Sequence, residues 1–92
     1  MCPTFDWDDT KAASNLAKHG VSFEEARTAF DDPWSMVRFD HAHSTEEERW
    51  RVLGRSGAQR LLVVIFTIRA GTIRVISSRR ATPRERDEYE QR

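Results

Sequence analysis

The most apolar part of the chain predicts a β-hairpin. Six apolar residues in a row occupy positions 61–66, and a second apolar run follows the Ala70-Gly71 pair. Short runs that are rich in β-branched residues and separated by a turn signal are typical of paired strands. We therefore expect strands over residues 61–69 and 72–80, the second of which ends in polar side chains.

A helix is predicted directly after this hairpin. Thr82 is a good N-cap residue, Pro83 suits the first helical position, and Glu85 stands three residues after the cap. This spacing is the signature of a capping box, in which side chains satisfy two backbone N–H groups at the helix start. The helix should run to about Glu90.

Another helix is predicted near the N-terminus, over residues 10–19. Asp8 or Asp9 can cap its start, and Gly20 can end it in a left-handed conformation. Small and apolar residues recur at three- and four-residue spacing, which predicts a narrow apolar stripe. The residues of this stripe are Ala12, Ala13, Leu16 and Ala17.

The next stretch predicts a second helix after a very short link. Ser22 and Glu25 form a capping box at its start, and its apolar face extends to Phe30. The sequence Asp31-Asp32-Pro33 should stop it. Two helices joined in this way can together cover one face of a sheet.

Three further segments complete the expected fold. Residues 5–7 predict an edge strand or an extended lead-in, residues 35–40 and 50–55 predict strands, and residues 41–44 predict a loop. Consecutive strands with short connections favour an antiparallel meander. We expect a single α+β domain over residues 1–92, with an antiparallel sheet of about four strands, two N-terminal helices and one C-terminal helix.

The net charge of zero conceals a division between the two halves of the chain. Residues 1–48 carry four basic and eleven acidic side chains, whereas residues 49–86 carry ten arginines and one acidic residue, Glu85. The basic half can attract a polyanion although the whole molecule is neutral. Arginine, whose planar fork suits phosphate and carboxylate, supplies thirteen of the fifteen cations. Some of these arginines should instead pair with the acidic half.

The sequence also bears on location. A single cysteine, Cys2, cannot form an internal disulfide, which is consistent with a reducing cytoplasm. Asp6, Asp8 and Asp9 stand where a secretion signal would need an apolar run. The longest apolar run is far shorter than the roughly 20 residues of a membrane helix, so we expect no membrane association.

The end of the second hairpin strand is a candidate anion site. Ser77, Ser78, Arg79 and Arg80 directly precede the helix whose N-terminal N–H groups and partial positive charge favour anions. Strand alternation predicts two sets of side chains on opposite faces. They are Ile73, Val75, Ser77 and Arg79 on one face, and Arg74, Ile76, Ser78 and Arg80 on the other. The alternative interpretation is an ordinary hairpin whose arginines extend into solvent.

The histidines and tryptophans give weaker signals. His41 and His43 lack a third ligand or a cysteine pair, so we expect no metal and no cofactor. His19 could be a catalyst or only a cation at the end of a helix. The three tryptophans could stack on bases or pack in the core.

Four segments of the chain closely resemble the BrnT family of bacterial type II toxins. They are FDWDDTKAASNLAKHGVSFEEA (5–26), FDDP (30–33), HSTEEERW (43–50) and VISSRRATPRERDEYE (75–90). Ser78 stands where the family often has alanine. The resemblance implies a small ribonuclease with a RelE-like fold. It also implies a BrnA-like ribbon-helix-helix antitoxin as partner, in a hetero-oligomer such as 2:2, with DNA bound only through the antitoxin.

The resemblance also implies which residues act on RNA. The family pattern includes Lys11, the Lys18-His19-Gly20 turn, the His43-Ser44 pair, Arg69, and the segment from Arg79 through Glu85 to Tyr89. RNA cleavage without a metal needs a base for the 2′-hydroxyl, cations for the phosphate and an acid for the leaving oxygen. The catalytic candidates are Arg69, Arg79 and Arg80 for charge, and His19, Glu85, Tyr89 or His43 for proton transfer. The RNA-binding candidates are Lys11, Lys18, His43, Arg74 and Ser77.

Two expectations follow for this site. Loss of Arg79 or Arg80 should give a folded protein with little toxicity, although alternation suggests that one of them faces RNA and the other holds the helix or the partner. The antitoxin should cover the basic half. The alternative function is a non-catalytic, arginine-rich module that binds an acidic partner segment or nucleic acid.

Overall fold

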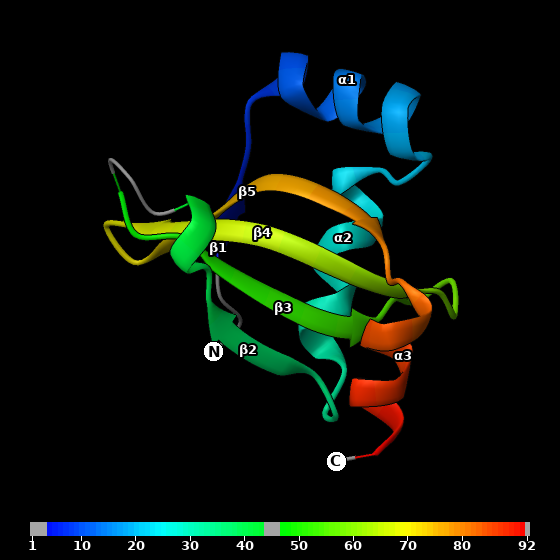
Figure 1. The fold of residues 1–92 in the computed structure, drawn as a ribbon. Helices are drawn as coiled ribbons and strands as arrows, with labels where there is room; N and C mark the ends of the chain where they lie inside the picture. Colours follow the sequence, from blue (N-terminus) through cyan, green and yellow to red (C-terminus); the bar gives the residue numbers. More distant parts are fainter. Residues whose placement is uncertain (1–3, 44–46, 92) are drawn as a thin grey trace.

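A computed structural model describes residues 4–43 and 47–91 and shows a five-stranded mixed sheet in the order β1-β5-β4-β3-β2 (Figure 1). The strands β2 to β5 form the expected antiparallel meander, and β1 runs parallel to β5 at the sheet edge. The strands are β1 (Thr4–Asp6), β2 (Met36–Phe39), β3 (Trp50–Arg55), β4 (Leu61–Arg69) and β5 (Thr72–Arg80).

The expected sheet of about four antiparallel strands is therefore one strand short. The strand that was not counted is β1. For this segment the sequence pattern predicts either an edge strand or an extended lead-in. Phe5 packs edge-on against Phe30 with ring centroids 5.1 Å apart. This contact is one of those that hold the segment against the sheet, where Asp6 lies beside Arg74. A strand of three residues depends on such tertiary contacts, which the local pattern does not reveal.

Three helices in the described residues complete the α+β fold, which confirms the predicted number of helices and their order along the chain. They are α1 (Asp9–His19), α2 (Phe23–Thr28) and α3 (Pro83–Glu90). Two short 3-10 turns accompany them, η1 (Ala29–Asp31) and η2 (His41–His43). Hence the second helix, whose apolar face was expected to extend to Phe30, ends at Thr28 and continues as the 3-10 turn η1. The expected loop after β2 contains η2. None of the helices in the described part of the chain is long and apolar enough to cross a membrane.

The two faces of the sheet carry separate cores. Even-numbered β4 residues such as Leu62 and Val64 pack under α2, while Leu61 and Val63 pack with Tyr89 of α3 on the other face. Figure 1 shows α2 behind the sheet and α3 in front of it. The candidate site described below lies on the same face of the sheet as α3, in the part of that face that α3 does not line.

A β-bulge in β5 changes which side chains share a face. Ile65 lies opposite Ser77, but Phe66 lies opposite Val75, so Ile76 is an extra residue in β5. The predicted grouping of Ile73 and Val75 with Ser77 and Arg79 is therefore wrong. Beyond the bulge, Ser77 and Arg79 lie on the α3 face, since their partners Ile65 and Val63 belong to that core.

Helix α1 lies beside the part of β5 that β1 does not cover, rather than across the sheet. Its buried residue is Asn15, whereas Leu16 is 50% exposed, so the predicted apolar stripe does not form a packed face. The Asn15 amide donates to the Ser78 carbonyl at 2.8 Å and accepts from the Ser78 N–H at 3.1 Å. It thus pairs with the open edge of β5, where unsatisfied backbone groups would otherwise be buried.

The expected pairing between the acidic and basic halves is present. Ser22 caps α2 as predicted, but the Glu25 carboxylate does not complete a capping box, because it binds the Arg60 guanidinium and the Ser56 hydroxyl. The Arg60 side chain is the main cause of a lowered pKa of Glu25. This pair ties α2 to the turn between β3 and β4.

Candidate functional site

A pocket of about 570 Å³ lies on the α3 face of the sheet. It is bounded by the end of α1, by η2 and by strands β3, β4 and β5. Its side chains are a mixture of cations, histidines and apolar groups. The residues used in the argument below are Arg49, Arg51, Arg79, His19, His41 and Ser77.

Cross-strand register brings the arginines to this pocket. Arg51 of β3 lies opposite Ile65 of β4, which in turn lies opposite Ser77 of β5. Directly opposed residues in a sheet point to the same face, so these three side chains form one row. Arg38 of β2 extends the row outward, since it pairs with Arg51.

The remaining cations stand on either side of this row. Arg49 precedes Arg51 by two residues and therefore points to the same face. Arg79 lies opposite Val63, one row nearer to α3. Three arginines from two segments thus line one pocket, although the whole protein has no net charge.

The bulge in β5 lies at the pocket. Ile76, the extra residue, and Ser77 both line it, as do the next two residues of the strand, Ser78 and Arg79. Bulges occur frequently beside active sites, where they redirect a side chain. Here the bulge turns both Ser77 and Arg79 away from the face of Val75 and toward the pocket.

Two histidines from distant parts of the chain line the same pocket. His19 is the last residue of α1, and its helix is held at β5 by Asn15. His41 is the first residue of η2 and packs edge-on against Phe39, with ring centroids 4.7 Å apart. Both side chains are exposed, so both can exchange protons with a bound ligand.

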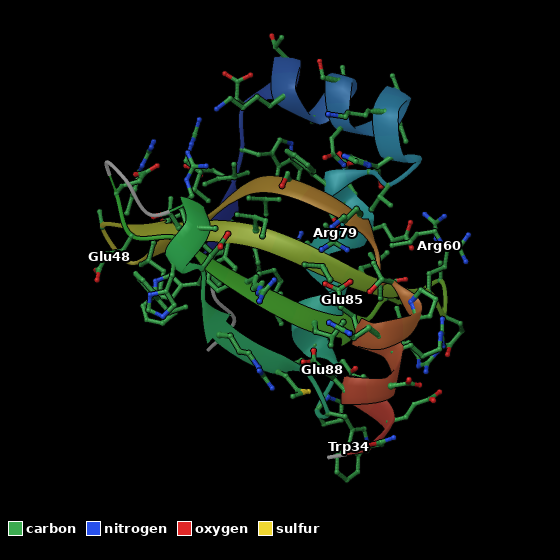
Figure 2. The ribbon with its side chains drawn as sticks, viewed as in Figure 1. Trp34, Glu48, Arg60, Arg79, Glu85 and Glu88 are labelled. Atoms are coloured by element: carbon green, nitrogen blue, oxygen red, sulfur yellow. The ribbon has the colours of Figure 1, made fainter. Side chains whose placement is uncertain are left out.

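Arg79 is held by a carboxylate from α3. Its Nη1 and Nη2 donate to the two Glu85 carboxylate oxygens at 2.7 and 2.9 Å, and Figure 2 shows the two side chains together at the start of α3. Chiefly because of Arg79, the pKa of Glu85 falls to about 2. At neutral pH Glu85 is therefore ionised and is a poor proton donor.

The structure does not bring the other predicted catalytic residues into this pocket. Arg80 lies opposite Leu62, on the face of α2. Arg69 forms hydrogen bonds of 3.1 to 3.3 Å with the Glu47 carboxylate near the hairpin turn. Tyr89 is buried, and its hydroxyl donates to Asp32 at 2.5 Å. Burial is the main cause of a raised pKa of Tyr89, so its hydroxyl stays protonated.

The predicted RNA-binding residues fall into four groups. Ser77 lines the pocket, whereas Arg74 pairs with Asp6 at 3.3 Å and lies outside it. Lys11 and Lys18 line a shallow second hollow that also includes His19 and so adjoins the pocket. His43 belongs to η2, but its side chain lies outside the described part of the structure, as does Ser44.

Several residues of the pocket were missed from the sequence. Arg51 belongs to the predicted strand 50–55 and Arg49 directly precedes that strand, so their common face could have been read from the two-residue spacing. The sequence pattern of His41 and His43 points to His41 only as a metal ligand. Asp40 is 6% exposed, and its backbone N–H donates to the Arg49 carbonyl at 2.8 Å. Nothing in the sequence pattern around Asp40 indicates that it belongs to a site.

The described residues contain no group of three His, Cys, Asp or Glu side chains that could hold a metal ion.

Comparison with protein families matches residues 7–85 to the family described as ribonuclease toxin, BrnT, of type II toxin-antitoxin system. Among solved structures, the fold is similar to the 1.1 Å crystal structure of the Brucella abortus ribonuclease toxin BrnT, with a TM-score of 0.68. That match has 25% sequence identity and covers 88% of this chain and 99% of the Brucella chain. Comparison with curated proteins gave no match.

Proposed function

Since the chain belongs to the BrnT family of ribonuclease toxins of type II toxin–antitoxin systems, we propose that the pocket between α1, η2 and strands β3 to β5 is where it cuts RNA. One observation carries this assignment: Arg51, Arg79, His19 and His41 come from four separate elements and line one pocket. Cleavage of cellular RNA in the cytoplasm would then arrest translation and growth.

The chemistry that fits this pocket is internal transesterification of RNA. The 2′-oxygen attacks the adjacent phosphorus and loses its proton to a base, while the 5′-oxygen leaves and takes a proton from an acid. The products are a 2′,3′-cyclic phosphate and a free 5′-hydroxyl. Histidine is the side chain best suited to both proton transfers near neutral pH, and we assign them to His19 and His41.

The arginines supply the charge that this reaction needs. Negative charge grows on the phosphate in the transition state, and preorganised donors aimed at it are worth about a hundredfold to a thousandfold each. Arg49, Arg51 and Arg79 can donate hydrogen bonds but cannot transfer protons, because a guanidinium stays protonated in proteins. We therefore propose that cleavage needs no metal ion.

The test is cleavage of a purified single-stranded RNA by the purified protein, with and without a chelator. We expect the same rate in both samples, and products that end in a 2′,3′-cyclic phosphate and a 5′-hydroxyl. Loss of cleavage in the chelator would overturn metal independence. Products with a 3′-hydroxyl and a 5′-phosphate would overturn the transesterification.

The family implies an antitoxin partner. We propose that this partner is a BrnA-like ribbon-helix-helix protein in a hetero-oligomer such as 2:2, and that DNA is bound only through it. The positive charge of Arg38, Arg51 and Arg79 supports docking on the sheet face that carries them, which we call the arginine face. Arg38 stands at the outer end of the row that leads to the pocket, and its side chain is 55% exposed. A partner that binds only the folded state would stabilise it by about 2.7 kcal/mol at a hundred times its Kd.

Charge reversal on each side of the molecule tests this docking. We expect Arg38→Glu to weaken antitoxin binding and Glu24→Arg, on the exposed side of α2, to leave it unchanged. The opposite pattern would place the antitoxin on the acidic helices and would refute docking on the arginine face.

A further inference from the structure

The Glu85 carboxylate makes more contacts than a helix cap requires. Its Oε1 accepts from the Thr82 N–H at 2.8 Å, which completes the capping box of α3. The same oxygen accepts from Arg79 Nη1, and the second oxygen, Oε2, accepts from Arg79 Nη2 at 2.9 Å. A capping box needs one acceptor oxygen. The second oxygen therefore serves Arg79.

Arg79 needs such a partner if it is to act at a fixed place. An arginine side chain carries about 2 kcal/mol of rotamer entropy, and this one stands near the end of β5 with 39% of its side chain exposed. Besides Glu85, it donates to the Arg80 carbonyl at 3.2 Å. These contacts with described residues use three of the five guanidinium N–H groups, and the other two are available to a phosphate.

We infer that Glu85 is a positioning residue, which orients Arg79 for the phosphate without touching the RNA itself. The inference rests on the proposed function, because it assigns the role of Glu85 through the pocket. It replaces the expectation that Glu85 transfers protons, for which an ionised carboxylate bound to arginine is poorly suited. It also links the start of α3 to the site through Glu85, since this one carboxylate caps the helix and holds the pocket arginine.

Substitutions can separate the two roles of Glu85. Glu85→Gln keeps an amide oxygen for the Thr82 N–H but removes the charge and the second acceptor. Thr82→Ala is the matched control, because it removes the hydroxyl that accepts from the Glu85 N–H at 3.2 Å and leaves the pair with Arg79. Glu85→Asp keeps the charge on a shorter side chain and serves as the conservative variant.

The readouts are kcat and KM on a short single-stranded RNA, together with thermal unfolding of each variant. We expect Glu85→Gln to lower kcat roughly 10- to 100-fold with a smaller change in KM, and Glu85→Asp to restore part of that loss. Thr82→Ala should lower the unfolding temperature and leave kcat unchanged. Wild-type kcat in Glu85→Gln, or an equal loss of kcat in Thr82→Ala, would overturn the inference.

A double-mutant cycle with Arg79→Ala completes the test. If Glu85 acts through Arg79, Glu85→Gln causes no further loss of kcat once Arg79 is absent. An equal loss in both backgrounds would show a structural effect and overturn the positioning role while the proposed site stands. Wild-type cleavage by Arg79→Ala itself would mean that the pocket is not the site, and the proposed function would fall with the inference.

Discussion

The side-chain amide of Asn15 pairs with the backbone of Ser78 as a neighbouring strand would. It forms two hydrogen bonds with that residue, of 2.8 and 3.1 Å, and a third of 3.0 Å with the Val21 carbonyl. Strand β1 covers β5 only as far as Arg74, so Asn15 closes the edge beyond it. Because His19 ends the same helix, this contact also determines where His19 lies.

Replacement of Asn15 should therefore be costly. Asn15→Leu would leave three buried backbone groups without partners, and we expect it to lower the free energy of unfolding by about 2–3 kcal/mol. Leu16→Ala, on the exposed side of the same helix, should change it by less than about 0.5 kcal/mol. Urea unfolding of both variants checks this. Equal effects would mean that α1 is held by its apolar stripe instead.

The Arg79–Glu85 pair should appear in the pH dependence of stability. The Glu85 carboxyl has a pKa of about 2 in the fold against an ordinary value of 4.5, so the unfolded chain takes up its proton first as the pH falls. The stabilisation is complete above pH 4.5 and disappears as the pH falls to about 2. We expect it to be about 1–2 kcal/mol after allowance for solvent screening.

Glu85→Gln isolates this contribution, because Glu25 also has a lowered pKa and would otherwise add to the same pH range. The difference in unfolding free energy between the two proteins should shrink as the pH is lowered from 5 to 2. A difference that stays constant over this range would contradict the pair's contribution.

The two histidines should control the pH profile of cleavage. A base and an acid acting together give a bell-shaped dependence of kcat/KM on pH. We expect His19→Ala and His41→Ala each to lower the rate by about 100-fold or more and to remove one limb of the bell. Lys18→Ala, beside His19 but outside the pocket, is the control and should keep both limbs. A full bell in both histidine variants would assign proton transfer to other residues.

Local signals predicted the elements on which the site is built. The Ala70-Gly71 turn is confirmed, and both residues have the positive φ that a two-residue hairpin requires, 50° and 80°. The capping box of α3 is confirmed as well, since both of its hydrogen bonds are present. These features depend on a few adjacent residues, and the sequence therefore contains what is needed to predict them.

Features that depend on tertiary contacts were not predictable in this way. The bulge at Ile76 follows from how β5 meets β4, and it reversed the expected face of Ser77 and Arg79. Asn15 is buried because α1 lies beside an open strand edge, which helical periodicity does not indicate. The convergence of Arg51 and His41 on one pocket depends on the cross-strand register and on the turn after β2.

Arg79 and Arg80 provide the most direct test of the whole account, because they are adjacent, identical in type and on opposite faces of β5. The measurement is the rate of cleavage of a single-stranded RNA by Arg79→Ala and Arg80→Ala in the presence of a chelator. We predict a loss of about a hundredfold to a thousandfold for Arg79→Ala and a rate close to that of the unmodified protein for Arg80→Ala. Equal rates in the two variants, or a loss confined to Arg80→Ala, would contradict the assignment of this pocket.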